Sequence, residues 1–338
     1  MNLGNKNILF FAPDFFGYDQ AIKKKLEAFG SIVDLYNERP SSNVFIKAII
    51  RFKKELLSFI IERYFDQIIK KNKDKNYDYI FIIKGEVFSP KVVLKFKQNF
   101  PKAKIILYLF DSINNYKSTQ ESLYLFDAAY TFDKTDSQSF PELKFRPLFY
   151  MDEFTKNNVN GNESIKYKYD ILFVGTAHSD RWIILEKIKK EAKKQNIKIY
   201  YYIYIQSPFV YLGRKLFDKK FKGLSLKDVH FKSISKEEII KLTYFSKSVL
   251  DIQHPKQTGM TMRTFEVLGA ERKLITTNQD VKQYDFYEPE NILIIDRNNP
   301  VISKKIFSEK YIISEISINS KYSLTGWINE IFEIKIPE

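Results

Sequence analysis

The order of apolar and polar positions along the chain predicts alternating strands and helices. Short apolar runs, such as residues 7–12 (NILFFA) and 169–176 (YDILFVGT), are typical of buried strands. Longer stretches with apolar residues at helical spacing follow them, such as 18–30 and 180–195. Strands and helices in turn predict parallel sheets that helices cover on both faces.

This alternation occurs twice, on either side of the polar, asparagine-rich segment 155–168 that contains Gly161. We therefore expect an α/β protein with two Rossmann-like, doubly wound domains. The first should span residues 1–158 and the second residues 165–320. Residues 321–338 should form a C-terminal helix that could cross back onto the first domain.

Composition supports two domains and removes several kinds of chemistry. The chain has 338 residues, more than one core usually holds. It has no cysteine, which excludes disulfides, thiolate catalysis and cysteine-ligated zinc. Its three histidines, His178, His230 and His254, lie far apart in the sequence, which argues against a histidine metal site.

The formal net charge of +14 indicates an anionic partner such as nucleic acid, an anionic membrane or a phosphate-bearing substrate. Segments 43–75 and 208–223 mix aromatic residues with lysines and could lie on an anionic membrane surface. The alternative is that their apolar residues belong to the core and their lysines are solvated. The first residues do not resemble a signal peptide, and no apolar run approaches the roughly 18 residues of a membrane span. We expect a cytoplasmic protein, peripheral at the inner membrane face if it contacts lipid.

An open parallel sheet binds ligands beyond the carboxyl ends of its strands, and this rule selects a few loops. In the first domain, the loops after the first, third and fourth predicted strands supply Asp14, Glu86 and Asp111. In the second domain, the loop after the first strand supplies Gly175 and Arg181 at the start of a helix, where an anion could bind.

A second loop of that domain, residues 254–261, runs into a predicted helix that carries Arg263 and Glu266 three residues apart. The helix start favours phosphate, and the arginine offers a planar guanidinium to phosphate oxygens. The carboxylate could accept from ribose hydroxyls. The candidate loop residues for binding such a phosphate-bearing donor molecule are Lys256, Gln257, Thr258, Gly259, Met260 and Thr261. The alternative is an ordinary capped helix with an Arg263–Glu266 surface pair.

Missing motifs narrow the chemistry further. The first strand is not followed by G-x-G-x-x-G, and the chain has no G-x-x-x-x-G-K-[ST], so a dinucleotide dehydrogenase and a P-loop kinase are both disfavoured. No two aspartates stand two positions apart, as metal-dependent sugar transferases usually need. We therefore expect metal-independent chemistry with no cofactor.

Several stretches resemble the CgeB-like, group 1 type glycosyltransferases of bacterial surface polysaccharide synthesis. The resemblance spans residues 7–296 and is most specific in RTFEVLGA (263–270). The stretches that carry it are YDILFVGTAHSDR (169–181), SVLDIQHPKQTGMTMRTFEVLGAERKLITTN (248–278), YDFYEPENILIID (284–296), YDYIFIIKGEVFSP (77–90) and KIILYLFDSI (104–113).

That resemblance implies the GT-B fold, with two Rossmann-like domains facing a cleft. It implies a nucleotide-sugar donor held by the second domain and a glycan or polyprenyl-linked acceptor held by the first. In the family, the carboxylate at Glu266 holds the ribose, and Thr258 to Arg263 hold the diphosphate. Related retaining enzymes often carry a glutamate where this chain has Thr258, so the inverting or retaining outcome stays open.

If the enzyme inverts, a general base must take the proton of the acceptor hydroxyl. Asp14 is the first candidate, with Asp111 and Glu86 after it; the alternative is that these residues serve a turn or a helix cap. Rival hypotheses are a non-hydrolysing nucleotide-sugar epimerase of the same layout and a basic nucleic-acid-binding protein. The chain has no recognisable nucleic-acid module, so we expect no nucleic-acid partner. A transferase-like subunit without activity is a third rival.

Overall fold

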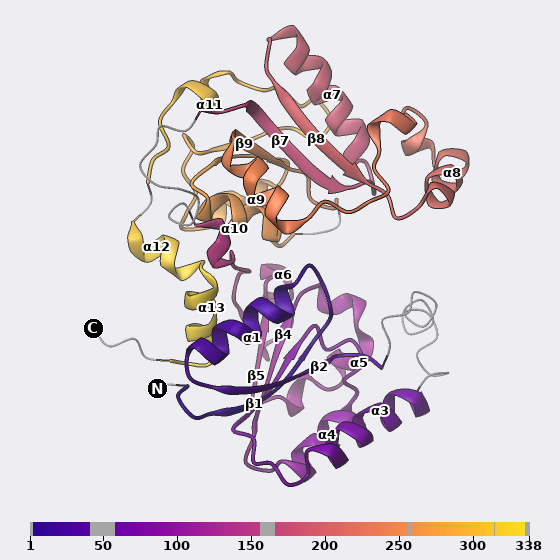
Figure 1. Ribbon diagram of the computed structural model, residues 1–338, viewed down its shortest axis with the longest axis vertical. Coiled ribbons are helices and arrows are strands. Elements are labelled where there is room, and N and C mark those ends of the chain that lie inside the picture. Colours follow the sequence, from indigo (N-terminus) through magenta and orange to yellow (C-terminus); the bar gives the residue numbers. More distant parts are fainter. Residues whose placement is uncertain (1–2, 41–57, 156–165, 256–257, 314, 335–338) are drawn as a thin grey trace. The chain divides into compact units, whose positions relative to one another are not determined.

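The computed structural model describes residues 3–40, 58–155, 166–255, 258–313 and 315–334 (Figure 1). The chain divides into two compact units, Met1–Pro147 together with Leu324–Glu338, and Leu148–Ser323. The sequence placed the linker around Gly161, which lies outside the described residues. Each unit is an α/β layer structure with its own parallel sheet.

The first unit is built on a sheet whose six strands, among the described residues, all pair in parallel in the order β2-β1-β3-β4-β5-β6. Its strands are β1 (Asn7–Ala12), β2 (Ile32–Asn37), β3 (Tyr79–Ile83), β4 (Lys104–Leu109), β5 (Ala128–Thr131) and β6 (Leu143–Phe145). The first five match apolar runs in the sequence, but β6 is too short for its pattern to stand out.

Helices cover both faces of this sheet. They are α1 (Tyr18–Ala28), α3 (Ser58–Lys71), α4 (Pro90–Asn99), α5 (Lys117–Gln120), α6 (Lys134–Ser139) and α13 (Leu324–Ile331). On one face, Phe11 of β1 meets Phe65 of α3 and Phe96 of α4. On the other, Phe10 stacks on Phe81 of β3. Neighbouring residues of one strand point to opposite faces, so β1 contributes to two apolar layers.

The last helix belongs to the first unit although it comes last in the chain. Trp327 of α13 is fully buried and meets the rings of Phe81 and Tyr108. The residues after the helix continue the contact, because Glu333 lies 2.8 Å from the Lys104 ammonium. The C-terminal helix therefore completes the face of the sheet opposite α3 and α4.

The second unit has a sheet of five parallel strands within its described residues, in the order β11-β10-β9-β7-β8. They are β7 (Tyr169–Thr176), β8 (Ile199–Tyr204), β9 (Ser246–Asp251), β10 (Lys273–Thr276) and β11 (Ile292–Ile294). All five fall within apolar runs of the sequence.

The helices of the second unit also lie on both faces of its sheet. They are α7 (Arg181–Lys194), α8 (Pro208–Phe217), α9 (Lys236–Tyr244), α10 (Met262–Gly269), α11 (Lys305–Ser308) and α12 (Ile316–Lys321). Ile275 of β10 joins the apolar cluster around α7, whereas its neighbour Leu274 lines a small cavity with Val267 of α10. The alternation of side chains along β10 thus separates the two layers.

The structure shows different environments for the two basic segments, 43–75 and 208–223, that the sequence analysis considered for membrane contact. In the described part of 43–75, α3 buries Ile61, Phe65 and Ile68 and leaves Phe59 exposed, so much of its apolar stripe is core. Segment 208–223 contains α8, which the sequence pattern did not identify as a helix. Within the described ranges, no helix has both the length and the apolar character needed to cross a membrane.

Candidate functional site

Both sheets reverse their strand order next to their first strand. In the first unit β1 lies between β2 and β3, and in the second β7 lies between β8 and β9. At such a switch point the loops leave in opposite directions and open a crevice beyond the carboxyl ends of the strands. The β7 and β9 loops carry the predicted donor residues, and the β1 and β3 loops carry Asp14 and Glu86.

Arg263 and Glu266 form an ion pair on α10, with 2.9 Å between Nη1 of the arginine and Oε2 of the glutamate. Both side chains are largely buried, at 17% and 7% of their accessible surface. A solvent-exposed pair would contribute little and would need no burial. The pair is therefore largely shielded from solvent, and its role in binding a nucleotide stays a prediction.

The start of α10 is held by Asp251, the last residue of β9. Its Oδ2 accepts hydrogen bonds from the hydroxyls of Thr261, at 2.7 Å, and Thr264, at 3.1 Å. Thr261 occupies the N-cap position, but its side chain accepts nothing from the helix. The Thr264 N–H donates to the Thr261 carbonyl at 3.1 Å. The earlier N–H groups of a first turn have no partner within a helix, which suits the start of α10 to an anion.

Arg181 joins the two loops of the switch point. As the first residue of α7, it donates from Nε to the carbonyl of Ile252 after β9, at 2.6 Å. Its Nη1 lies 3.4 Å from the carbonyl oxygen of Thr176 at the end of β7. Burial lowers the pKa of this guanidinium. The predicted Arg181 therefore lies beside the α10 loop and ties it to β7.

A second arginine, Arg297, lies beside the same loops after β7 and β9, although the sequence analysis did not select it. Arg297 holds Asp180 through two hydrogen bonds, Nε to Oδ2 at 2.7 Å and Nη2 to Oδ1 at 2.8 Å. It also donates to the Gln253 carbonyl at 2.8 Å. These bonds hold the pKa of Asp180 below its ordinary value. Arg297 follows β11, so the rule of carboxyl ends could have found it.

Two of the three histidines, distant in the sequence, also meet here. The rings of His178 and His254 are 5.7 Å apart. Burial first, and then the neighbouring Arg181, lowers the pKa of His178 to about 4, so its ring is neutral at neutral pH. The Arg214 guanidinium of α8 donates to the carbonyl of Ala177, next to His178.

The other predicted donor residues take varied positions. A Cβ on Gly175 would come within 3.1 Å of the Phe173 ring and 3.4 Å of Arg181 Nη1, so a small residue suits this point. Thr258 is exposed and its carbonyl accepts from Asn278 at 3.1 Å. Gly259 and Met260 are buried, and Lys256 and Gln257 lie outside the described residues.

In the first unit, Asp14 lies in the exposed loop after β1 and lines a cavity of about 390 Å³. Asp19, in the first turn of α1, lines the same cavity and is 8% exposed. Oδ2 of Asp19 accepts from the Gln20 side chain at 3.0 Å, while its buried Oδ1 has no hydrogen-bond partner. The cavity therefore offers two carboxylates to a ligand with hydroxyl or amino groups.

Glu86 has a different environment from Asp14. It lies 2.7 Å from the Lys84 ammonium and 3.2 Å from Arg39. Glu38, which follows β2 and was not predicted, accepts from the Glu86 backbone N–H at 3.1 Å and is fully buried. Burial raises the pKa of Glu38 to about 7, against the opposing effects of Lys84 and Arg39. Glu86 is thus held in ion pairs by two cations.

Asp111 is exposed and already engaged. Its carboxylate accepts from the Ser112 N–H at 2.9 Å, the Asn115 side chain at 3.0 Å and the Tyr116 hydroxyl at 3.1 Å. Its two oxygens are therefore already taken up by three donors of the same loop. Among the three predicted carboxylates, Asp14 is the one that makes no hydrogen bond or ion pair with another described residue.

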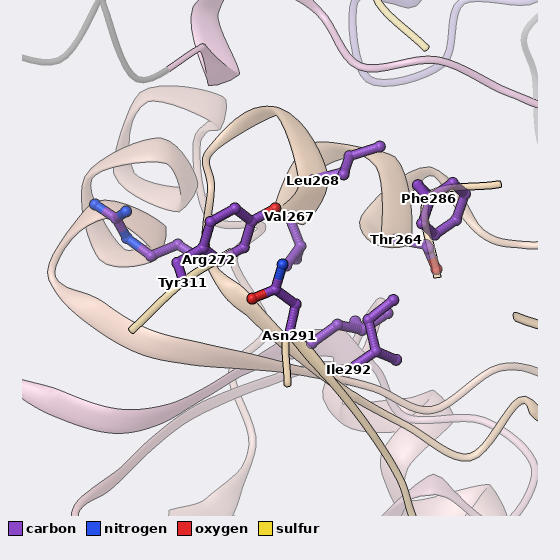
Figure 2. Close-up of a pocket in the computed structure, with 9 residues that line it drawn as sticks. Thr264, Val267, Leu268, Arg272, Phe286, Asn291, Ile292 and Tyr311 are labelled. Atoms are coloured by element: carbon purple, nitrogen blue, oxygen red, sulfur yellow. The ribbon is translucent and has the colours of Figure 1, made fainter. Parts of the chain in front are cut away.

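A small cavity also lies against α10 (Figure 2). Thr264, Val267 and Leu268 line it from α10, and Asn291 and Tyr311 border it as well. Its volume of about 10 Å³ is close to the minimum that holds one water. It is therefore a packing gap and not a substrate site.

Solved structures of glycosyltransferases and of nucleotide-sugar epimerases resemble the chain over nearly its whole length. HepE from Anabaena, in complex with UDP and glucose, matches with a TM-score of 0.57 and 11% identity, over 97% of this chain and 99% of that one. The lipopolysaccharide outer core galactosyltransferase WaaB matches at 0.56 and 12%, over 98% and 100%. The UDP-GlcNAc 2-epimerase of Methanocaldococcus jannaschii, in complex with UDP-GlcNAc and UDP, matches at 0.54 and 11%, over 98% and 99%.

No protein-family model and no curated protein matches the chain. At such low identity the structural likeness shows the fold alone. The fold is GT-B, with two Rossmann-like units on parallel sheets of six and five strands among the described residues. The expected fold class is confirmed.

Proposed function

We propose that the protein is a glycosyltransferase that moves a sugar from a nucleotide-sugar donor to a glycan or lipid-linked glycan. The observation that carries the proposal is the buried Arg263–Glu266 pair on α10, beside the β7–β9 switch point. Arg263 and the start of α10 bind the diphosphate, and Glu266 accepts from the ribose hydroxyls. HepE and the archaeal epimerase, which share the fold, were solved with UDP or UDP-sugars, which supports this class of donor.

The acceptor belongs, in this proposal, to the cavity of the first unit. Its carboxylates Asp14 and Asp19 suit sugar hydroxyls, and the exposed rings of Phe15 and Phe16 stand next to Asp14. Asp14 takes the proton of the attacking hydroxyl as the nucleoside diphosphate leaves. The reaction uses no cofactor and no metal, and it serves bacterial surface polysaccharide synthesis at the cytoplasmic face of the inner membrane. We propose that the protein belongs to the CgeB-like subfamily of glycosyltransferases.

The first experiment is thermal unfolding with UDP, GDP, CDP, ADP, dTDP and CMP. A ligand that binds only the folded state stabilises it by about 2.7 kcal/mol at a hundredfold excess over its Kd. One nucleotide should raise the Tm of the wild type, and Glu266→Ala should lose that response. Glu237→Ala, which removes an exposed carboxylate of α9 in the same unit, is the matched control and should keep it.

If no nucleotide stabilises the protein and single-stranded or duplex nucleic acid does, the basic surface is the function and the transferase proposal fails. If Glu266→Ala and the wild type respond equally to the nucleotide, the donor site lies elsewhere.

Asp14→Asn tests the base. We expect it to lower transfer by about a hundredfold or more and to leave the nucleotide-induced rise in Tm unchanged. Asp66→Asn, which changes an exposed carboxylate on α3, should keep full activity. Full transfer by Asp14→Asn would remove Asp14 as the base, and a loss in Asp111→Asn alone would assign the role to Asp111.

A nucleotide-sugar epimerase is the second candidate, because an epimerase shares this fold over almost the whole chain. It needs no acceptor. Incubation of the protein with a stabilising nucleotide sugar, followed by NMR of the sugar ring, separates the two. A new epimer formed without acceptor supports epimerisation, and turnover that depends on acceptor supports transfer.

A further inference from the structure

Helix α8 is fixed to the second unit by one of its faces. Ser207 caps it by accepting from the Val210 N–H at 3.2 Å. Tyr211 is buried and joins the apolar cluster around α7, and its hydroxyl donates to the Leu224 carbonyl at 2.9 Å. This attachment determines which face of the helix is turned outward.

The outward face is apolar and uncovered. Its large side chains have high exposed fractions, namely Phe209 86%, Leu212 54%, Leu216 68% and Phe217 89%. Positions 209, 212 and 216 repeat at helical spacing and lie on one face, with 217 at its edge. Scattered exposed apolar residues are common, but four on two helical turns form a patch that indicates a partner.

Basic residues surround this patch. Residues 208–227 contain six lysines and arginines against one acidic residue, Asp218. The lysines that follow the helix, Lys219, Lys220, Lys222 and Lys227, are exposed. The Asp218 side chain accepts from the Lys220 N–H at 2.9 Å. An apolar face flanked by lysines is typical of helices that lie in the interface of an anionic membrane.

The same charges disfavour a second copy of this chain as the partner. A symmetric dimer places one patch against its own copy, which would bring the two lysine clusters together. Anionic lipid instead offers an apolar interior for the phenylalanines and phosphates for the lysines.

We propose that α8 is a membrane-binding helix that inserts Phe209, Leu212, Leu216 and Phe217 into an anionic phospholipid surface, with the following lysines at the headgroups. The inference builds on the proposed function, since it assigns the surface by which the enzyme would reach a lipid-linked acceptor. Arg214 of α8 donates to the carbonyl of Ala177, so this helix contacts the loop between the proposed donor residues Gly175 and Arg181.

Vesicle sedimentation tests the inference without any transfer reaction. The wild type should bind vesicles of phosphatidylglycerol and phosphatidylcholine, and should bind pure phosphatidylcholine at least about tenfold more weakly. Phe209→Ser combined with Phe217→Ser should lower binding to the anionic vesicles by about tenfold or more. Lys219→Glu combined with Lys220→Glu should do the same.

The matched control is Phe59→Ser, which removes a phenylalanine of similar exposure, 74%, from α3 of the first unit. It should bind vesicles like the wild type. The nucleotide-induced rise in Tm, measured on each variant, shows that it is folded and separates this proposal from the donor site.

Three results would overturn the inference: no vesicle binding by the wild type, equal binding to neutral and anionic vesicles, or loss of binding in Phe59→Ser alone. If the wild type does not bind vesicles and light scattering shows a dimer that the α8 variants lose, the patch is an interface between copies of this chain.

Discussion

At the scale of single residues, the most informative groups are carboxylates whose surroundings differ sharply. Asp14 is exposed and makes no hydrogen bond or ion pair within the described part of the chain, Asp111 accepts three hydrogen bonds, and Glu86 lies between two cations. The sequence placed all three at the carboxyl ends of strands but could not rank them by environment. Ranking them needs the folded neighbours, because Arg39 reaches Glu86 from the end of β2 and the loop after β4 folds back onto Asp111.

Glu38 provides a pH-dependent prediction at this scale. Burial raises its pKa to about 7 from an ordinary 4.5, so the folded protein binds this proton more tightly than the unfolded chain does. The contribution of Glu38 to stability is therefore complete below about pH 4.5 and is lost as the pH rises through about 7. The free energy of unfolding of the first unit should fall over this window, by at most about 3 kcal/mol.

Urea unfolding at several pH values, followed by Trp327 fluorescence, measures this effect. Trp327 is the tryptophan of the first unit, and a Trp182→Phe background removes the signal of the second. Glu38→Gln should flatten the pH dependence, whereas Glu62→Gln on α3 should leave it as in the wild type. A stability that does not fall between about pH 5 and pH 8 would contradict the raised pKa.

At the scale of elements, α10 depends on a close approach that its own sequence does not reveal. A Cβ on Gly269 would lie 2.6 Å from the ring atoms of Tyr150, a residue more than a hundred positions earlier in the chain. The helix pattern predicted α10 and the spacing of Arg263 and Glu266. It did not explain why position 269 is a glycine, because Tyr150, whose ring lies against it, is distant in the sequence.

Gly269→Ala should therefore destabilise the second unit by about 1–3 kcal/mol, since the Tyr150 ring must move. Gly213→Ala is the matched control, because its Cβ would meet nothing within 4 Å in the middle of α8. That variant should be neutral or stabilising by up to about 1 kcal/mol. Thermal unfolding of both variants measures these changes in stability. Equal changes would show that the close approach of position 269 to the Tyr150 ring does not affect stability.

At the scale of the whole molecule, the first unit is completed by a helix from the other end of the chain. Trp327, Phe332 and their neighbours cover the sheet face that Phe81 and Tyr108 present. The apolar pattern of residues 323–334 predicted a helix, but it did not determine where the helix packs.

Trp327→Ala should destabilise the first unit by about 3–5 kcal/mol, because the ring is fully buried. Trp182 remains as the only tryptophan in this variant and reports the second unit. Its unfolding transition should stay near that of the wild type, while circular dichroism detects an earlier transition of the first unit. A joint shift of both transitions would show that the two units unfold together.

The sequence by itself determined the α/β class, the parallel strands, the repetition of the pattern in two halves, the loop that carries Asp14 and the helix starts that carry Arg181, Arg263 and Glu266. These follow from local periodicity and from the direction of parallel strands, which short stretches encode. Only the tertiary structure decided that β7 lies beside β9, that Arg181 meets the Ile252 carbonyl, and that His178 lies near His254. Strand order and the packing of α13 depend on which distant apolar faces bury one another, and no local spacing encodes that choice.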